Sequence, residues 1–238
     1  MSQIDFTKQV VVLTGSNRGL GNAILKELLK RGVKKVYAMA RNPDQIQVSD
    51  PRLVKLSFDV TDKARAKEVG EHLADATLLI NNAGTLSFGG ILSAPIHDIE
   101  KDFAVNFFGT LNAVRALTPV LEKNQGAIAT VLSLVSLAPA PGISGYSASK
   151  AAAYSLMQAL RYELKGKVSI YNVYPAGIDT DMLKGVDIAK SNPEDVAKSL
   201  IDGLISGQED IFPESEEMGK LFMSNPKGFE QAFASMAS

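Results

Sequence analysis

The stretch Val10-Val-Val-Leu-Thr-Gly-Ser-Asn-Arg-Gly-Leu-Gly21 decides the fold class, because it passes from a β-branched run through a glycine-rich turn into a helix. The run is typical of a buried strand, and apolar residues at helical spacing follow until Gly32 ends the helix. Glycines in such a turn let the backbone approach a pyrophosphate, which the positive N-terminus of the helix then holds. Glycine-rich turns also serve purely structural roles, so it is the flanking strand and helix that make this one indicate a nucleotide. The residues expected to contact the nucleotide are Gly15, Ser16, Asn17, Arg18, Gly19, Leu20 and Gly21.

Strand and helix patterns alternate along the remainder of the chain. Runs rich in β-branched and apolar residues predict strands at 35–40, 53–59, 77–80, 127–132, 168–173 and, weakly, 210–212. Helical spacing predicts helices at 64–74, 98–121, 193–206 and over a segment that ends near residue 164. Strands that alternate with helices form crossover units, which give a parallel sheet covered on both faces. No repeat and no linker rich in proline, glycine or serine interrupts this α/β pattern, so we expect one domain over 1–238.

Composition and charge limit the classes of protein to consider. Hydrophobic residues make up 45% and charged residues 21% of the 238 residues, a balance that suits a globular fold with a sizeable core. The formal net charge is -1 and no block of basic residues occurs, so a nucleic-acid partner is not expected. The absence of cysteine excludes disulfides and thiol catalysis, and the two histidines lack metal-ligand spacing, so no metal site is expected. No N-terminal apolar core and no run of about 20 apolar residues occurs, so we expect a cytoplasmic protein with no membrane partner.

The end of the second expected strand bears on which dinucleotide is bound. An acid normally holds the ribose 2′-hydroxyl at this place, and here the sequence reads Ala40-Arg41. The guanidinium of Arg41 could stack on the adenine and pair with a 2′-phosphate, and Arg18 in the glycine turn could reach the same phosphate. The alternative is that both arginines are solvated surface residues. Two arginines near the place where the acid is missing favour NADP(H) over NAD(H).

Two further strand ends carry residues suited to a nucleotide. Asp59 and Val60 end the third expected strand, where an aspartate could bind the adenine amino group. The competing role for an acid here is a helix N-cap, which Thr61 or Asp62 could fill instead. The fourth strand runs into Asn81-Asn-Ala-Gly84, whose small residues suit a ribose lying across the turn, although the segment alone would be an ordinary turn. The candidate contacts in it are Asn82, Ala83 and Gly84.

The segment Gly145-Tyr-Ser-Ala-Ser-Lys150 is the clearest indication of chemistry. Tyr146 and Lys150 are four residues apart, which places them on one face of a helix, one turn from each other. An ammonium beside a phenol lowers the pKa of the phenol, which lets tyrosine act as an acid or base near neutral pH. A free phenol has a pKa near 10, so bringing it to about 7 corresponds to roughly 4 kcal/mol. Ser133 lies thirteen residues upstream at a strand end, with Ser136 as a rival for the role of a serine in this site.

Together these motifs resemble the short-chain dehydrogenase/reductase family, in its compact single-domain branch. The matching residues occur in the family's order and are Thr14-Gly-x-x-x-Gly-x-Gly21, Asp59-Val60, Asn81-Asn-Ala-Gly84, Asn106, Ser133, Tyr146-x-x-x-Lys150 and Pro175 through Thr180. The resemblance implies a three-layer, doubly wound Rossmann fold with a seven-stranded parallel sheet and a nicotinamide cofactor. It also implies a homodimer or homotetramer, in which the helices around 98–121 and 146–164 pair across a twofold.

In that family the catalytic set consists of Asn, Ser, Tyr and Lys, which fall here on Asn106, Ser133, Tyr146 and Lys150. Tyr146 is expected to protonate the alkoxide formed when a hydride reaches a carbonyl carbon, and Lys150 and the oxidised nicotinamide to stabilise its phenolate. Ser133 is expected to hold the carbonyl oxygen where charge develops, and Asn106 to hold a water near Lys150 in a proton path. The expected activity is the NADP(H)-dependent interconversion of a carbonyl and an alcohol on a small molecule.

After the sixth expected strand the chain reads Pro175-Ala-Gly-Ile-Asp-Thr180, with alanine where the family usually has glycine. The resemblance implies that this segment binds the nicotinamide amide and that residues 181–192 form a short substrate loop. The cofactor contacts expected from it are Pro175, Ala176, Gly177, Ile178 and Thr180, together with Tyr146 and Lys150. The alternative from a different class is a regulator or scaffold that binds a nucleotide without turnover. Such a protein would be expected to lose the tyrosine or the lysine, and this chain keeps both.

Overall fold

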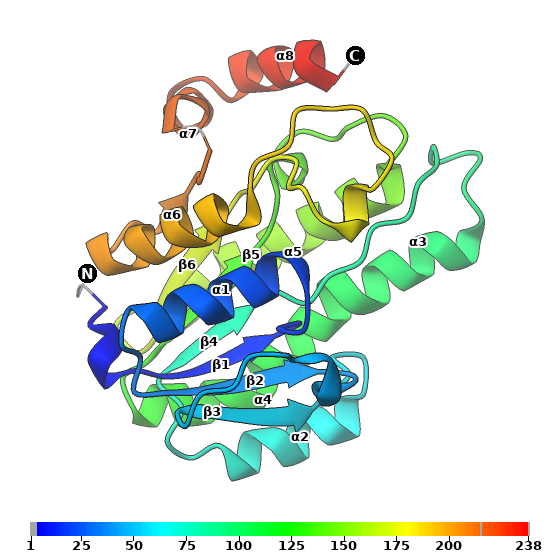
Figure 1. The fold of residues 1–238 in the computed structure, drawn as a ribbon. Helices are drawn as coiled ribbons and strands as arrows, with labels where there is room; N and C mark the ends of the chain where they lie inside the picture. The colour runs from blue at the N-terminus through cyan, green and yellow to red at the C-terminus, as the bar shows by residue number, and fades with distance from the viewer. Residues whose placement is uncertain (1–3, 215, 238) are drawn as a thin grey trace.

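A parallel sheet of seven strands forms the centre of the computed structural model, which describes residues 4–214 and 216–237. The strands lie in the order β3-β2-β1-β4-β5-β6-β7 (Figure 1). Their bounds are β1 Val10–Thr14, β2 Lys35–Ala40, β3 Leu53–Ser57, β4 Leu78–Asn81, β5 Ala127–Val131, β6 Ser169–Val173 and β7 Asp210–Ile211. In the central pairs, Val12 lies opposite Tyr37 on one side and Leu79 on the other. The predicted seven-stranded parallel sheet is therefore confirmed.

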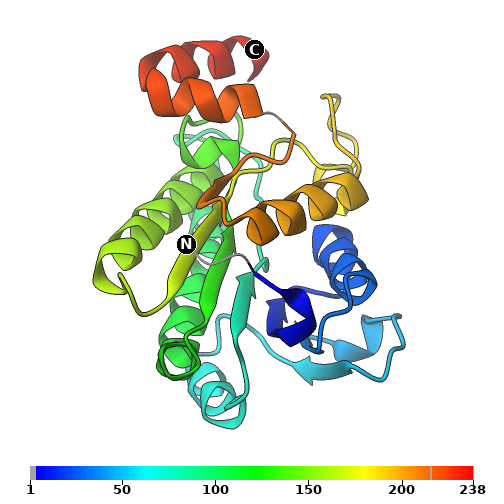
Figure 2. The same ribbon diagram turned by 90° about the vertical axis from the view of Figure 1, so that its left-hand side faces the viewer.

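Helices cover both faces of the sheet, which gives three layers (Figure 2). One face packs against α1 (Gly19–Lys30) and α6 (Pro193–Ser206). The other packs against α2 (Lys63–His72), α4 (Thr110–Lys123) and α5 (Ser144–Glu163). Side chains alternate along each strand, and because both faces are buried, β1 is apolar along nearly its whole length. Short 3-10 turns occur at η1 Phe6–Lys8, η2 Pro43–Gln45, η4 Leu134–Ser136 and η5 Asp181–Leu183.

The strand order reverses between β1 and β4. The chain builds outward from β1 to β3, returns to place β4 beside β1, and then builds outward to β7 on the other side. Connections that leave the carboxyl ends of strands diverge at such a point, and ligands bind in the crevice between them. The glycine turn that follows β1 and the segment 82–84 that follows β4 are the two connections at this place. The topology therefore brings both predicted nucleotide segments to one crevice.

One long helical stretch differs from the sequence prediction. In place of a single helix over 98–121, the chain forms α3 (Ile96–Asp102), a π-helical segment η3 (Phe103–Gly109) and then α4. The side chain of Asn106 in η3 bonds the backbone of Thr85 in the preceding connection. Wider turns of this kind occur mostly as single insertions in α-helices, frequently at functional sites. Helical spacing cannot reveal them, because they depend on such tertiary contacts.

The C-terminal tail packs on the body of the protein through two helices, α7 (Glu216–Ser224) and α8 (Pro226–Ala237), coloured orange and red in Figure 1. Phe229 of α8 is fully buried, in a cluster that includes Leu132, Leu134, Ala153 and Tyr174. Leu132 and Leu134 follow β5, Tyr174 follows β6 and Ala153 lies in the middle of α5, so the tail covers the carboxyl ends of β5 and β6. None of the helices described is long and apolar enough to span a lipid bilayer.

Candidate active site

The glycine turn between β1 and α1 disfavours side chains at three positions, either by close contacts or by a positive φ. At Gly15, where φ is +68°, a Cβ would lie 2.9 Å from the Cα of Ala83, and at Gly19, where φ is +52°, one would lie 3.2 Å from Cγ2 of Thr180. A Cβ at Gly21 would overlap the carbonyl oxygen of Gly15. The N-cap side chain of α1 makes no capping hydrogen bond, so the first backbone amides of the helix need another acceptor. A cradle of bare backbone at a helix N-terminus fits a phosphate group.

Polar side chains fasten this turn to the neighbouring strands. Nδ2 of Asn82 donates to the carbonyl oxygens of Thr14 and Gly15, both at 3.0 Å. Oγ1 of Thr14 in turn accepts from the backbone amide of Asn82 at 3.0 Å. The hydroxyl of Ser16 donates to the carbonyl oxygen of Met39 at 3.0 Å. The side chains of Asn82 and Ser16, both predicted as nucleotide contacts, therefore brace the turn.

The two arginines predicted to bind a 2′-phosphate differ in their surroundings. Nη1 of Arg18 lies 3.5 Å from Oδ2 of Asp181, and both side chains are largely exposed. This ion pair joins the glycine turn to the beginning of the expected substrate loop. Arg41 is exposed just after β2. Asn17, also predicted as a contact, donates through Nδ2 to Oε1 of Gln45 at 2.9 Å.

Asp59 lies in a turn and not in the third strand, because β3 ends at Ser57. Its Oδ1 accepts from the backbone amide of Thr61 at 2.9 Å and from the Thr61 hydroxyl at 2.8 Å, which forms a local side-chain turn. Asp62 caps α2, as the sequence alternative allowed. Val60 is buried beneath the helices of that face. Asp59 therefore does not cap α2, and it lies just beyond the carboxyl end of β3.

The segment after β6 closes the base of the expected substrate loop. Ile178 pairs with Ser191 in an isolated bridge, and the backbone amide of Ser191 donates to the carbonyl oxygen of Gly177 at 2.8 Å. These contacts bring together the two ends of residues 181–192. Thr180 lies against the glycine turn, so the segments after β1, β4 and β6 meet.

Tyr146 and Lys150 lie side by side on α5, with Nζ of Lys150 5.8 Å from the centre of the Tyr146 ring. Lys150 is 6% exposed, and its Nζ donates to the carbonyl oxygen of Val131 at 2.8 Å. Ser133 lies two residues beyond the end of β5, and its hydroxyl donates to the carbonyl oxygen of Pro175 at 3.3 Å. Three of the four predicted catalytic residues therefore meet where β5 and β6 end.

Burial dominates the pKa values of this pair. Burial raises the pKa of Tyr146 to about 12, although a side-chain hydrogen bond with Ser133 lowers it and the charge of Asp102 raises it further. Burial also lowers the pKa of Lys150 to about 8, against the opposing charge of Asp102. Protein groups by themselves therefore keep the phenol neutral. A tyrosine pKa near 7 would need a further positive charge, for which the oxidised nicotinamide is the expected source.

Asn106 is buried in η3 with its side chain fully used. Its Oδ1 accepts from the backbone amide of Thr85, and its Nδ2 donates to the Thr85 carbonyl and to Oγ of Ser149, all at 2.9 Å. The side chain thus ties the connection after β4 to α5 beside Lys150. A Cβ at Gly84 would lie 3.3 Å from Oδ1 of Asn106 and 3.7 Å from Nζ of Lys150. All four predicted catalytic residues are therefore grouped around the carboxyl ends of β4, β5 and β6.

Ser136 proves to be a positioning neighbour of Ser133. Its hydroxyl oxygen accepts from the backbone amide of Ser133 at 3.0 Å, in a capping box that opens η4. Sequence reasoning missed Asp102, which is fully buried and accepts from the hydroxyl of Ser87 at 3.1 Å and from its amide at 3.3 Å. Burial raises the pKa of Asp102. The feature of the sequence that could have pointed to Asp102 is its position, one helical turn before Asn106.

A sequence model described as short chain dehydrogenase matches residues 9–191. The chain belongs to the short-chain dehydrogenase family. An uncharacterized oxidoreductase of Schizosaccharomyces pombe is 33% identical over 74% of this chain and 62% of its own length, so the chain matches less than two thirds of that relative. Mouse 17-beta-hydroxysteroid dehydrogenase 13 is 28% identical over 94% of this chain and 79% of its own length.

Solved short-chain dehydrogenases share the fold over almost the whole chain. A short chain dehydrogenase from Burkholderia cenocepacia, solved in complex with NADP, is 32% identical with a TM-score of 0.90, over 96% of this chain and 98% of the other. One from Burkholderia phymatum in complex with NAD is 19% identical with a TM-score of 0.81, over 99% and 98%, which shows the fold alone. Membership of the short-chain dehydrogenase family makes the chain an oxidoreductase of NAD(P)-dependent type, and the glycine cradle fits such a cofactor.

Proposed function

We propose that this short-chain dehydrogenase interconverts a carbonyl and an alcohol on a small molecule with NADP(H) as its cofactor. The observation that carries the proposal is the grouping of Tyr146, Lys150 and Ser133 where β5 and β6 end. Gly84 lies against Lys150, at the crevice where the strand order reverses. A phenol, an ammonium and a hydroxyl at that place suit proton transfer to a developing alkoxide.

Each residue of the group has a separable task. A nicotinamide held in this crevice would supply or take up the hydride at the substrate carbon. Tyr146 donates its phenolic proton to the substrate oxygen during reduction and takes it back during oxidation. Lys150, which is held by the Val131 carbonyl, places its positive charge beside the phenol. Ser133 would turn its hydroxyl from the Pro175 carbonyl to the substrate oxygen.

The cofactor would be held by segments from the five connections that follow β1, β2, β3, β4 and β6. The turn from Gly15 to Gly21 would hold the pyrophosphate, and Arg41 and Arg18 the 2′-phosphate. Asp59 would bind the adenine amino group, and residues 82–84 the ribose. The backbone of Ile178 and the hydroxyl of Thr180 would bind the nicotinamide amide.

Removing the Arg41 side chain is expected to discriminate between the two dinucleotides. The variant Arg41→Ala should bind NADPH about tenfold or more weakly, since a charge-assisted hydrogen bond to a phosphate contributes roughly 1.5–3 kcal/mol. Its affinity for NADH should change little, because NADH has no 2′-phosphate. Titration of each dinucleotide followed by nicotinamide fluorescence measures both affinities. Arg115→Ala, an exposed arginine on α4, is the control; an equal loss for both dinucleotides would refute this role of Arg41.

Filling the cradle is expected to block both dinucleotides equally. A Gly21→Ala Cβ would overlap the carbonyl oxygen of Gly15, so the turn has to move away from the start of α1. We expect NADPH and NADH affinities to fall together by at least about a hundredfold, as for a misplaced binding group. The neighbouring substitution Asn22→Ala on the same helix serves as the control. Unchanged binding by Gly21→Ala would place the pyrophosphate elsewhere.

The whole proposal is tested by titrating NADPH and NADH separately and then screening small ketones and aldehydes for NADPH oxidation. Tight NADPH binding, weak NADH binding and turnover of a carbonyl would support it. Tight binding with no turnover across the screen would favour the regulator. Binding of neither dinucleotide would contradict the assignment of the crevice.

A further inference from the structure

The peptide group between Pro175 and Ala176 joins two side chains that are distant in sequence. Its carbonyl oxygen accepts from the hydroxyl of Ser133 at 3.3 Å and from the backbone amide of Leu134 at 3.0 Å. Its N–H donates to Oε2 of Glu214 at 3.2 Å. A trans peptide group is planar, and its C=O and N–H point in opposite directions. Ser133 and Glu214 therefore bind opposite edges of one rigid unit.

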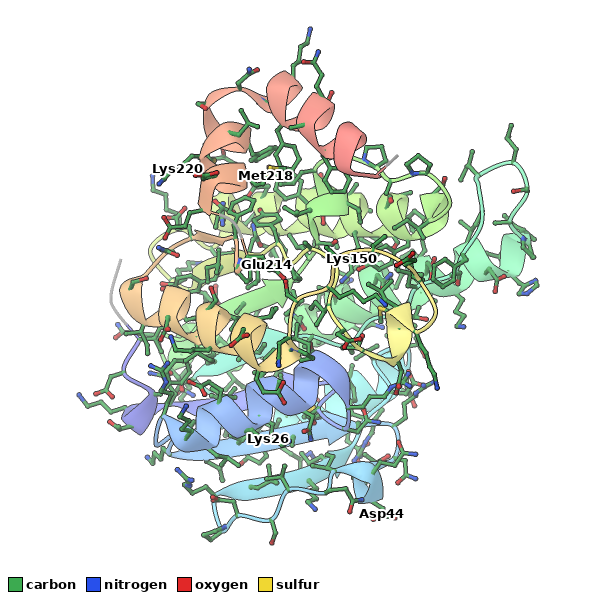
Figure 3. The ribbon with its side chains drawn as sticks, turned by 45° about the horizontal axis from the view of Figure 1, so that its top comes forward. Lys26, Asp44, Lys150, Glu214, Met218 and Lys220 are labelled. Atoms are coloured by element: carbon green, nitrogen blue, oxygen red, sulfur yellow. The ribbon has the colours of Figure 1, made fainter. Side chains whose placement is uncertain are left out.

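Glu214 is an unusual residue to find in this position. It lies between β7 and α7 and is half-buried, and its second oxygen, Oε1, is enclosed without a hydrogen-bond partner among the described residues. Burying a carboxylate is unfavourable unless it is hydrogen-bonded. Among the described residues, the amide of Ala176 is the group of another residue that donates a hydrogen bond to the Glu214 carboxylate. Burial raises the pKa of Glu214, and the backbone amides of Ala176 and of Glu214 itself oppose that shift. Figure 3 shows Glu214 and Lys150 in the region beneath the tail helices.

The tail fixes where this carboxylate lies. Phe212, two residues before Glu214, stacks on Tyr174 with ring centres 4.8 Å apart, and Tyr174 directly precedes Pro175. On the other side, a Cβ at Gly219 of α7 would lie 2.5 Å from the Phe212 ring, so the helix packs closely on it. The chain on both sides of Glu214 is thus anchored next to the segment that it contacts.

We propose that Glu214 is a positioning residue for hydride transfer, which holds the Pro175–Ala176 peptide and, through the bond of that peptide to the Leu134 amide, the place of Ser133 just after β5. The inference rests on the proposed role of Ser133 in binding the substrate oxygen. A charged acceptor makes a stronger hydrogen bond than a neutral one, and bonds in a chain polarise one another.

Three variants test this role. Glu214→Ala is expected to lower kcat about tenfold, since small misplacement of a catalytic group has effects of this order or larger. Its NADPH affinity should stay within about twofold of the wild-type value, because the glycine cradle is untouched. Glu214→Gln keeps an acceptor oxygen for the Ala176 amide and should recover most of kcat. Glu217→Ala, an exposed acid on α7, is the matched control and should leave kcat unchanged.

A double-mutant cycle separates positioning from a general structural role. If Glu214 acts through Ser133, then Glu214→Ala should have little further effect on the residual rate of Ser133→Ala, whereas independent effects would multiply. Multiplying effects, or full activity of Glu214→Ala, would overturn the proposal.

Hydrogen–deuterium exchange of the protein without cofactor tests the contact between Glu214 and the Ala176 amide independently of enzymatic turnover. The Ala176 amide should exchange faster in Glu214→Ala than in the wild-type protein, and it should not do so in Glu217→Ala. Equal exchange in all three proteins would overturn the proposed contact. A wild-type protein that reduces no carbonyl but shows this difference would instead contradict the proposed function and leave the contact standing.

Discussion

A Tyr146→Phe variant is expected to lose carbonyl reduction by about 10²–10⁴-fold, the range for removal of a general acid or base. The substitution removes only the hydroxyl, so the ring keeps its place beside Lys150. NADPH affinity should change little, which separates a defect in proton transfer from a defect in binding. Steady-state rates and a fluorescence titration on the same preparation measure the two. Tyr162→Phe, an exposed tyrosine on the same helix, is the control, and full activity of Tyr146→Phe would contradict the mechanism.

The pH dependence of alcohol oxidation should report the same tyrosine. Oxidation uses the phenolate as base, so its rate is expected to rise with pH and to level off above the apparent pKa of Tyr146. Protein groups alone place that pKa at about 12, whereas Lys150 is cationic below its pKa of about 8. The position of the rising limb therefore measures how far the bound oxidised cofactor lowers the phenol pKa. The limb should be absent from the Tyr146→Phe profile.

A Phe229→Ala variant is expected to reduce the free energy of unfolding by about 3–5 kcal/mol, as is usual for truncating a buried phenylalanine. Phe229 is fully buried, and its ring lies 5.4 Å from that of Phe222 and 6.1 Å from that of Phe233. The cavity would open in the cluster that joins the tail to Leu134 and Ala153. This loss is a large fraction of the 5–15 kcal/mol by which domains are usually stable.

Chemical denaturation followed by circular dichroism measures that loss. The control is Met223→Ala on α7, where the side chain is 70% exposed and the expected change is within about 0.5 kcal/mol. A separate early transition in Phe229→Ala would show that the tail detaches before the sheet unfolds. An unchanged free energy of unfolding would mean that the tail adds nothing to stability.

Local sequence patterns predicted the elements well where burial is uniform. The run 10–14 is a strand buried on both faces, and the helix at 193–206, with proline near its first turn, has the predicted bounds. The apolar runs predicted the seven strands, but the strand order did not follow from them, because such runs do not say which strands are neighbours. Asp59 was predicted to end the third strand, whereas β3 ends two residues earlier at Ser57, because β-branched spacing does not mark where pairing with β2 stops.

Tertiary contacts account for what the sequence could not reveal at the site. Asn82 is hydrogen-bonded to a turn nearly seventy positions earlier in the chain, so nothing local distinguishes a brace from a nucleotide contact. The burial of Asp102 likewise depends on how α3 packs, so the residues next to it in the sequence do not reveal it. Glu214 contacts Ala176 across 38 residues, and an acid at the start of the tail gives no hint of that partner. The motif at Tyr146 and Lys150 was predictable because its geometry lies within one helix.

The reversal of strand order between β1 and β4 also affects how the protein folds. Val12 faces Tyr37, 25 positions along the chain, and Leu79, 67 positions along, so one central pairing requires a much longer loop to close. Non-local parallel pairings of this kind form slowly. The crevice exists only once β4 has joined β1, so a chain without this pairing offers a nucleotide no complete site. A bound dinucleotide would accordingly prolong the lifetime of the native state by slowing unfolding, and would do little to speed its formation.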